Sequence, residues 1–288
     1  MGRFHPAILM TFPRPPPQAG LMHKKTTLRH FCWLIITAAL QASNAAPVKL
    51  TLVSGYPVVE DVYLNGQGPF RFLLDTGAQT NQLDASLAAR LGFPSTFRTV
   101  LSTLAGDRLV GGGRIAGVRV GTVNASDQEF VFRSLEAAGP LSGKIHGVLG
   151  QEFLHHFDYL LDFRTRRIVF GAMQPDGADS LPLESIDGRP AIQTDKGRMV
   201  IDSGAPAAIL YSVAPGHSDY MLLTASGESA GAKARGLKFR AGGKVYSTTA
   251  ILASRGSLTE DGVVPASMFH AIYICNSQSS VTLDPRHF

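Results

Sequence analysis

The sequence is poor in cysteine, tryptophan and charge. Its 288 residues include two cysteines and one tryptophan, and 17% of the residues are charged. Cys32 lies in an N-terminal segment that we expect to be removed, which leaves Cys275 with no partner for an intramolecular disulfide. We expect Cys275 to be a small buried residue on a strand. Stability must therefore come from a hydrophobic core, and 44% of the residues are hydrophobic.

The first 45 residues lack acidic side chains altogether. Basic residues from Lys24 onward precede the apolar run 31–40, and small residues follow it, which is the order typical of a secretory signal. We expect cleavage after Ala45, with Met22 as an alternative start. An apolar run of about ten residues is too short to span roughly 30 Å of hydrocarbon, so we expect no stable membrane anchor.

The net charge of +5 belongs to this leader. Five of the 27 basic residues lie in residues 1–45, so the rest of the chain carries 22 basic and 22 acidic side chains. No basic patch interleaved with aromatic residues remains, and the basic cluster 164–167 is typical of a solvated hairpin turn. We therefore expect no nucleic-acid partner.

Strand signals dominate the remaining sequence. Short apolar runs bounded by Gly, Asn, Asp or Pro predict strands. Helical patterns are short: one covers 84–91, with Asp84 as N-cap and Gly92 at its end, and another covers 151–157. The clearest strand patterns are 58–64, 70–74, 114–120, 159–163 and 168–170.

Apolar periodicity stops between Gly171 and Pro190, where the composition is that of a linker. The expected organisation has four parts. They are a leader or signal peptide (1–45), an N-terminal β lobe (46–172), a linker (173–189) and a C-terminal β lobe (190–288).

The two expected lobes correspond in sequence at three places, in the same order. FLLDTGA at 72–78 matches MVIDSGA at 199–205, and LSTLAGD at 101–107 matches LTASGE at 223–228. GVLGQEFLH beginning at Gly147 matches GVVPASMFH beginning at Gly262. Three matches in register indicate an internal repeat, and hence two related β lobes.

The first match contains an acidic tripeptide in each half. Asp-Thr-Gly begins at Asp75 and Asp-Ser-Gly begins at Asp202, each directly after an apolar strand. One such tripeptide is an ordinary turn signal. Two in equivalent lobes related by a pseudo-twofold axis would bring the two carboxylates together. Such a pair shares a proton, so one member can act as base and the other as acid.

These motifs resemble the aspartic peptidases, both the two-lobed pepsin-like enzymes and the retroviral type. In that family an apolar-apolar-Gly element braces each Asp-Thr/Ser-Gly loop. The resemblance implies an all-β fold with two related acid-protease-type β-barrel lobes, a few short helices and an active-site cleft between the lobes. It also implies a flap over 101–113. The implied site consists of catalytic Asp75 and Asp202, supporting loop residues Thr76, Gly77, Ser203 and Gly204, the brace Val148, Leu149 and Gly150, and candidate flap residues Leu101, Ser102, Thr103, Leu104, Ala105 and Gly106.

The sequence departs from the family pattern at several positions. Pro265 stands where the second brace has glycine, and no tyrosine lies between Leu101 and Gly121. Ala78 and Ala205 follow the two tripeptides, where pepsin-like enzymes carry a hydroxyl residue. The loss of these donors should raise the apparent pKa values of the two carboxyl groups, and so move activity into the mildly acidic or near-neutral range.

The function we predict is that of an aspartic endopeptidase that acts on peptides or proteins without metal or cofactor. We expect a monomer with internal pseudo-twofold symmetry, exported to the periplasm or secreted. The alternative is a catalytically inactive peptide-binding or inhibitory module of the cell envelope. Metal-dependent hydrolysis is a third class. The histidines that could serve it lack any His-Glu-x-x-His spacing, and His155 and His270 occupy equivalent repeat positions, which suggests shared packing.

Overall fold

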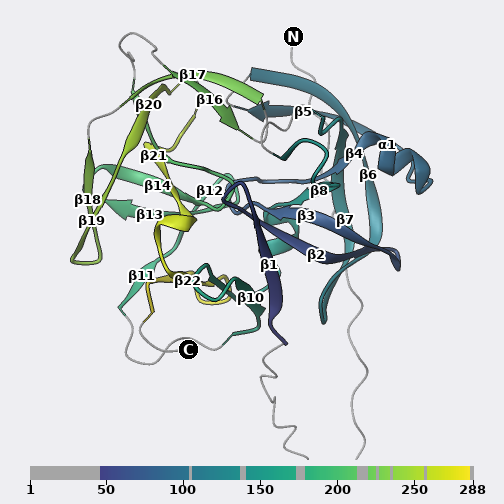
Figure 1. Ribbon diagram of the computed structural model, residues 1–288, viewed down its shortest axis with the longest axis horizontal. Coiled ribbons are helices and arrows are strands. Elements are labelled where there is room, and N and C mark those ends of the chain that lie inside the picture. The colour runs from purple at the N-terminus through teal and green to yellow at the C-terminus, as the bar shows by residue number, and fades with distance from the viewer. Residues whose placement is uncertain are drawn as a thin grey trace, which may run out of the picture. The chain divides into compact units, whose positions relative to one another are not determined.

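A computed structural model describes residues 46–103, 106–136, 141–172, 179–212, 220–224, 227–233, 236–255 and 258–285. The predicted leader, and Leu104 and Ala105 of the predicted flap, lie outside the described residues. Within the described ranges the protein is nearly all β, with very few short helices (Figure 1), which confirms the predicted fold class.

In the residues that the structure describes, the first half contains strands β1 to β10 and the helices α1 and α2. Helix α1 begins as the sequence predicts, because the Asp84 carboxylate accepts hydrogen bonds from the N–H groups of Ser86 and Leu87. The elements are β1 (Val48–Val53), β2 (Tyr56–Leu64), β3 (Gln67–Leu74), β4 (Asn81–Asp84), α1 (Ala85–Arg90), β5 (Phe97–Thr103), β6 (Gly106–Val120), β7 (Val123–Arg133), β8 (Gly147–Leu149), α2 (Gln151–Leu154), β9 (Tyr159–Asp162) and β10 (Arg167–Phe170).

The described part of the second half contains strands β11 to β23 and the 3-10 helix η2. Cys275 is buried on β22, as expected. The elements are β11 (Ser180–Pro182), β12 (Glu184–Ile186), β13 (Arg189–Thr194), β14 (Gly197–Asp202), β15 (Ala208–Ser212), β16 (Tyr220–Thr224), β17 (Gly227–Lys233), β18 (Leu237–Ala241), β19 (Lys244–Thr248), β20 (Ala250–Ser254), β21 (Gly262–Pro265), η2 (Ala266–Met268), β22 (Ala271–Cys275) and β23 (Ser280–Leu283).

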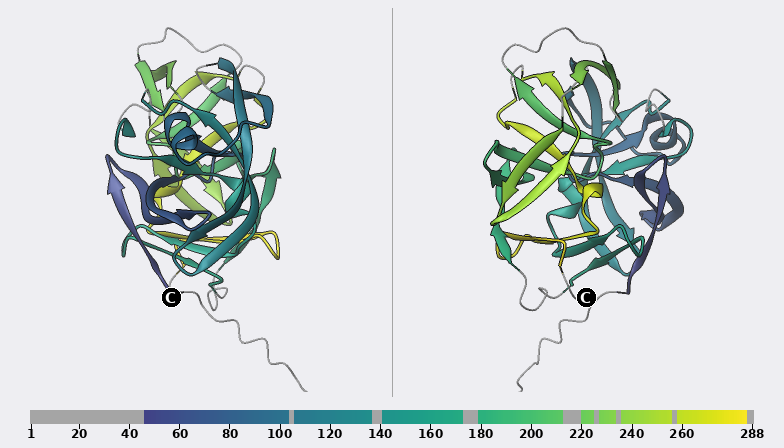
Figure 2. Two further views of the ribbon diagram at one scale, coloured as in Figure 1. Left: turned by 90° about the vertical axis from the view of Figure 1, so that its right-hand side faces the viewer. Right: turned by 60° about the vertical axis from the view of Figure 1, so that its left-hand side comes forward.

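The two halves arrange their strands in one common order. The first half has the order β2-β3-β8-β4-β7-β6-β5, and the second half has β13-β14-β21-β15-β20-β17-β16. The directions of pairing also agree, since β3–β8 and β14–β21 are parallel whereas β4–β8 and β15–β21 are antiparallel. Each of these strands therefore has a counterpart in the other half, and Figure 2 shows both sets of strands from two further directions.

One sheet segment joins the halves. Its strands run β11-β23-β22-β9-β10-β1, with β22 antiparallel to β9 at the centre. Strands β22 and β23 come from the end of the chain and lie beside β9 and β10 of the first half, at the lower side of Figure 1. Strands β11, β23 and β22 of the second half occupy the same order as β1, β10 and β9 of the first half. The segment therefore has an approximate twofold arrangement.

The linker expected over 173–189 is partly built into these sheets. Of its described residues, 180–182 form β11 and 184–186 form β12. These two short strands pair with β23 and β13, just as the longer β1 pairs with both β10 and β2. Strands of three residues, one ending in Pro182 and the other followed by Gly188, carry too little apolar alternation to be recognised from sequence.

Apolar packing extends through both halves. A single cluster of buried residues contains Phe72 and Phe130 from the first half and Ile201 and Phe269 from the second. No helix in the described part of the chain has the length and apolar character needed to cross a bilayer.

Candidate active site

Asp75 and Asp202 stand at equivalent ends of two buried strands. Asp75 follows β3, whose last residues Leu73 and Leu74 are at most 1% exposed, and Asp202 ends β14 after the equally buried Ile201. The Asp75 N–H donates to the Leu149 carbonyl at 3.0 Å. Each aspartate therefore lies where its strand leaves the core, and both aspartates remain partly exposed.

The structure brings these two carboxyl groups together across the halves. A Cβ atom added to Gly77 would lie 2.7 Å from Asp202 Oδ1, and one added to Gly204 would lie 2.7 Å from Asp75 Oδ1. Each loop glycine therefore leaves space for the aspartate of the other half. Each also donates its N–H to the aspartate of its own half, at 3.0 Å from Gly77 and 2.6 Å from Gly204.

Thr76 and Ser203 hold the two loops against each other. The Thr76 N–H donates to Ser203 Oγ at 3.0 Å, and the Ser203 N–H donates to Thr76 Oγ1 at 2.9 Å. Their hydroxyl groups donate onward to the carbonyls of Ile201 and Leu74, both at 2.7 Å. The two side chains are 1% and 3% exposed, so these bonds are protected from water.

The electrostatics favour a shared proton. Burial raises the pKa of Asp75 well above its ordinary value, and the charge of Asp202 and the hydrogen bond between the carboxyl groups raise it further. Burial also raises the pKa of Asp202, against the opposing effects of the bond to Asp75, the Gly204 N–H and the positive charge of Arg189. Two such groups cannot both ionise easily, so one acid and one carboxylate coexist.

The first brace fixes the Asp75 loop through a glycine that no other residue can replace without displacement. A Cβ on Gly150 would lie 2.6 Å from the Thr80 carbonyl oxygen and 2.7 Å from that of Ala78. The Gly150 N–H donates to Asn81 Oδ1 at 3.0 Å, and the Gln151 side chain donates to the Thr76 carbonyl at 2.8 Å. Val148 and Leu149 pair with β3 in the core.

The second brace packs beside the Asp202 loop with different residues. Pro265 pairs with Asp202, and it occupies the place that Gly150 has in the first half. Ala208 stands where the first half has Asn81, because each begins the strand that follows the loop. Proline has no N–H to satisfy, and alanine offers no acceptor, so the two changes compensate each other.

The predicted flap is a hairpin of β5 and β6. Leu101 pairs with Arg108, Ser102 with Asp107 and Thr103 with Gly106. Its counterpart in strand order is the β16–β17 hairpin, and both hairpins lie toward the upper side of Figure 1.

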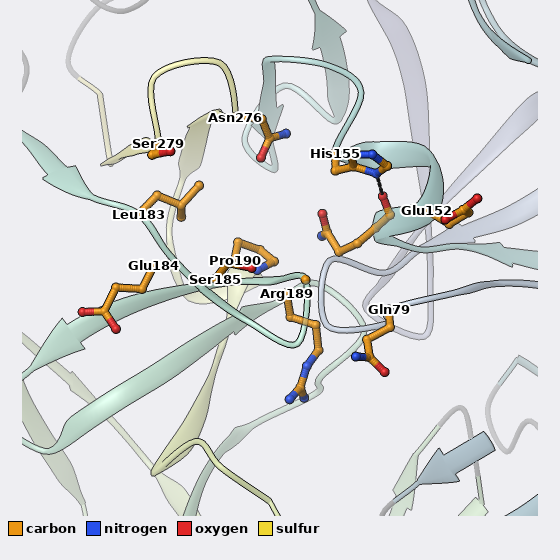
Figure 3. A pocket seen from close by; sticks show the side chains of 12 residues that line it. Gln79, Glu152, His155, Leu183, Glu184, Ser185, Arg189, Pro190, Asn276 and Ser279 are labelled. Atoms are coloured by element: carbon orange, nitrogen blue, oxygen red, sulfur yellow. Dashed lines mark hydrogen bonds between the residues drawn. The ribbon is translucent and has the colours of Figure 1, made fainter. Parts of the chain in front are cut away.

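A cavity of about 470 Å³ lies at Gln79, which follows the Asp75 loop (Figure 3). It is lined by residues of both halves, including Gln79, Gln151 and His155 from the first and Arg189 and Asn276 from the second. Its lining includes neither Asp75 nor Asp202. The cavity therefore does not contain the carboxylate pair.

Sequence reasoning missed three residues close to the pair. The charges of Asp202 and Asp75, after burial, raise the pKa of Tyr56, so this phenol lies near both carboxyl groups. The positive charge of Arg189 lowers the pKa of Asp202, and Arg189 forms an ion pair with the buried Glu260. Aligning the two halves by their strand order reveals that these positions are equivalent. The number of residues that separates them from the Asp motif does not, because the β2–β3 and β13–β14 hairpins differ in length.

The histidine prediction was wrong in one respect. His155 and His270 do occupy equivalent places after β8 and β21, but both side chains are exposed and do not pack in the core. His146 instead accepts a hydrogen bond from the Arg71 N–H at 3.1 Å. Within the described ranges, no group of three or more His, Cys, Asp or Glu side chains is arranged to hold a metal ion.

One family model matches part of this chain. Residues 60–153 match the family described as aspartyl protease. The solved structures that match include a retropepsin-like aspartic protease from Rickettsia conorii, at 17% identity, a TM-score of 0.33, and coverage of 43% of this chain and 89% of that one. No curated protein matches the sequence. The family match, which spans the first Asp-Thr-Gly motif and its brace, confirms that this chain resembles the aspartic peptidases.

Proposed function

We propose that this protein is an aspartic endopeptidase whose Asp75 and Asp202 together activate water for peptide-bond hydrolysis. The observation that carries the proposal is the crossed packing at the paired loops, in which each loop glycine makes room for the aspartate of the other half. This arrangement leaves both carboxyl groups partly exposed, where they can contact a substrate.

The chemistry needs one ionised and one protonated carboxyl group. The carboxylate removes a proton from water, the water oxygen bonds to the peptide carbonyl carbon, and the carboxylic acid gives its proton to the carbonyl oxygen. In the resulting gem-diol the C–N bond breaks as the carboxyl group that took the water proton gives this proton to the amine nitrogen. One gem-diol hydroxyl gives its proton to the carboxyl group that had protonated the carbonyl oxygen, which restores the starting state.

The equivalence of the two loops supports turnover over the inactive alternative. The second half lacks the brace glycine, yet its loop keeps the Gly204 bond to Asp202 and all of the Ser203 bonds to the first half. Because Pro265 is matched by Ala208, its presence does not require that Asp202 be displaced. We propose on the same basis that the halves arose by duplication and act within a monomer.

Incubation with a denatured protein tests the proposal. We expect new peptide termini, loss of cleavage with a transition-state inhibitor of aspartic peptidases, and no effect of a metal chelator. Binding of the inhibitor without cleavage would support the inactive peptide-binding module. Loss of activity with chelator alone would point to a metal hydrolase.

We also propose that the protein is exported, on the evidence of the basic residues from Lys24 and the apolar run 31–40. N-terminal sequencing of the protein recovered outside the cytoplasm should begin at Ala46. Recovery only from the cytoplasm, with the leader intact, would contradict export.

A further inference from the structure

The two carboxyl groups of the pair have different neighbours across their strands. Strand β13 pairs with β14 so that Ala191 faces Val200, and continuing this register by two residues places Arg189 opposite Asp202. Strand β2 pairs with β3 in the same way in the first half, and the same step places Tyr56 opposite Asp75. Residues directly opposite on antiparallel strands have Cβ atoms about 5 Å apart.

Arg189 is held by a buried acid. Its guanidinium forms two hydrogen bonds to Glu260, at 2.9 and 3.0 Å, and Glu260 is 1% exposed. The Arg189 Nε donates to the Ile186 carbonyl at 3.2 Å. A two-point pair of this kind fixes both the position and the direction of the charge.

The first half has no such pair at the equivalent positions. Gly262 and Gly147 are counterparts, because each faces the third residue before the aspartate on the neighbouring parallel strand. Counting back two residues makes Ile145 the counterpart of Glu260. An aromatic and an aliphatic residue, Tyr56 and Ile145, therefore replace the cation and the carboxylate.

The other ionisable groups near the pair do not balance this difference. Tyr56 on β2 and Tyr211 on β15 are neutral, because burial first and nearby acids second raise the pKa of each phenol. Asp187, in the turn before β13, lies 3.4 Å from the outer side of the Arg189 guanidinium and is largely exposed. Arg189 is the cation that lowers the pKa of Asp202.

We propose that the Arg189–Glu260 pair makes the two carboxyl groups unequal, so that Asp202 starts each turnover as the ionised base and Asp75 as the protonated acid. This inference rests on the proposed function. Arg189 and Glu260 are positioning residues, since neither touches the reacting atoms. Glu260 is needed because an unpaired buried arginine would be costly, and would favour ionisation of both carboxyl groups.

Carboxyl titration by NMR tests the inference without requiring turnover. The remaining carboxyl group is titrated in Asp75→Asn and in Asp202→Asn, with each made in the wild-type background and in Arg189→Gln/Glu260→Gln. We expect Asp202 alone to titrate at least about one pH unit below Asp75 alone, the low end of the effect of an adjacent opposite charge. The difference should fall to less than half when the pair is neutralised.

Two controls keep the result specific. Arg114→Gln removes an exposed arginine from its pair with Asp127 and should leave the difference unchanged. Arg189→Lys keeps the charge and should retain most of the difference. If the glutamine pair does not fold, Arg189→Tyr/Glu260→Ile installs the residues that the first half already uses at these positions.

Equal or reversed titration of Asp75 and Asp202, or a difference that survives neutralisation of the pair, would overturn the inference. Failure of the proposed function has a separate signature, because an inactive wild-type protein would still give the titration difference if the pair acts as described. In an active protein, the acid limb of the kcat/KM profile should move to higher pH in the neutralised variant.

Discussion

Thr76 and Ser203 exchange hydrogen bonds in both directions across the two halves of the chain. Each backbone N–H donates to the hydroxyl of the other residue, and each hydroxyl donates to a carbonyl of the other half. The two aspartates that precede them therefore cannot separate unless buried hydrogen bonds break. The relative position of the carboxyl groups is thus set by their neighbours in the sequence.

Replacing Thr76 with valine should destabilise the protein by about 2–4 kcal/mol. The change keeps the shape of the side chain but leaves the buried Ser203 N–H without its acceptor and removes the hydrogen bond to the Ile201 carbonyl. Urea unfolding would measure the loss. Thr249→Val, a matched change at an exposed position, should have little effect, and equal stability of the two variants would contradict the account.

Gly150→Ala should impair both stability and activity. The new methyl group would overlap the carbonyl oxygens of Thr80 and Ala78, so the loop that carries Asp75 must shift. Thermal unfolding and peptide hydrolysis together would report the effect. Gly117→Ala is the control, because a Cβ there meets no atom closer than 3.9 Å. Similar losses in both variants would show that the brace has no special role.

The carboxyl pair should cost stability as pH rises. Both native-state pKa values lie above the value of 3.8 expected for an unfolded aspartate, so the native state binds more protons than the unfolded state above pH 3.8. Stability must then fall as pH rises through the native pKa values. Asp75→Asn removes the part of this dependence that comes from Asp75. Its melting temperature, measured relative to the wild type, should rise from pH 4 to pH 8, and a constant offset would contradict the prediction.

Activity should extend into the mildly acidic or near-neutral range. Ala78 provides no hydroxyl group to stabilise ionised Asp75, and Ala205 provides none to Asp202. The Ala205→Ser variant adds such a donor beside Asp202, the base of the pair, so the acid limb of its kcat/KM profile should move to lower pH. A wild-type optimum below about pH 3, where the pepsin pair still works, would disagree with the prediction.

Local sequence was sufficient wherever an element depends on its own residues. The Asp84 cap predicts the start of α1, and the clusters of glycine, asparagine and proline predict the hairpins. The repeat predicts which residues have counterparts, and this was enough to pair Asp75 with Asp202.

The remaining features depend on contacts between distant residues. Arg189 and Glu260 are 71 residues apart, and nothing in either local sequence marks them as partners. The sequence alone marks Pro265 as a departure from the brace pattern, and only the strand order shows that it lies beside Ala208, the counterpart of Asn81. Strands β11 and β12 were missed because their pairing with β23 and β13, and not their own composition, makes them strands.

The most direct test of the account is the rate of peptide hydrolysis by Asp75→Asn and by Asp202→Asn, each confirmed to be folded by circular dichroism. Both substitutions are nearly isosteric, and each removes one proton-transferring group. We predict that each lowers kcat/KM by at least about 10²-fold, the lower end of the contribution of a positioned acid or base. A folded variant of either aspartate that hydrolyses peptide at the wild-type rate would contradict the central claim.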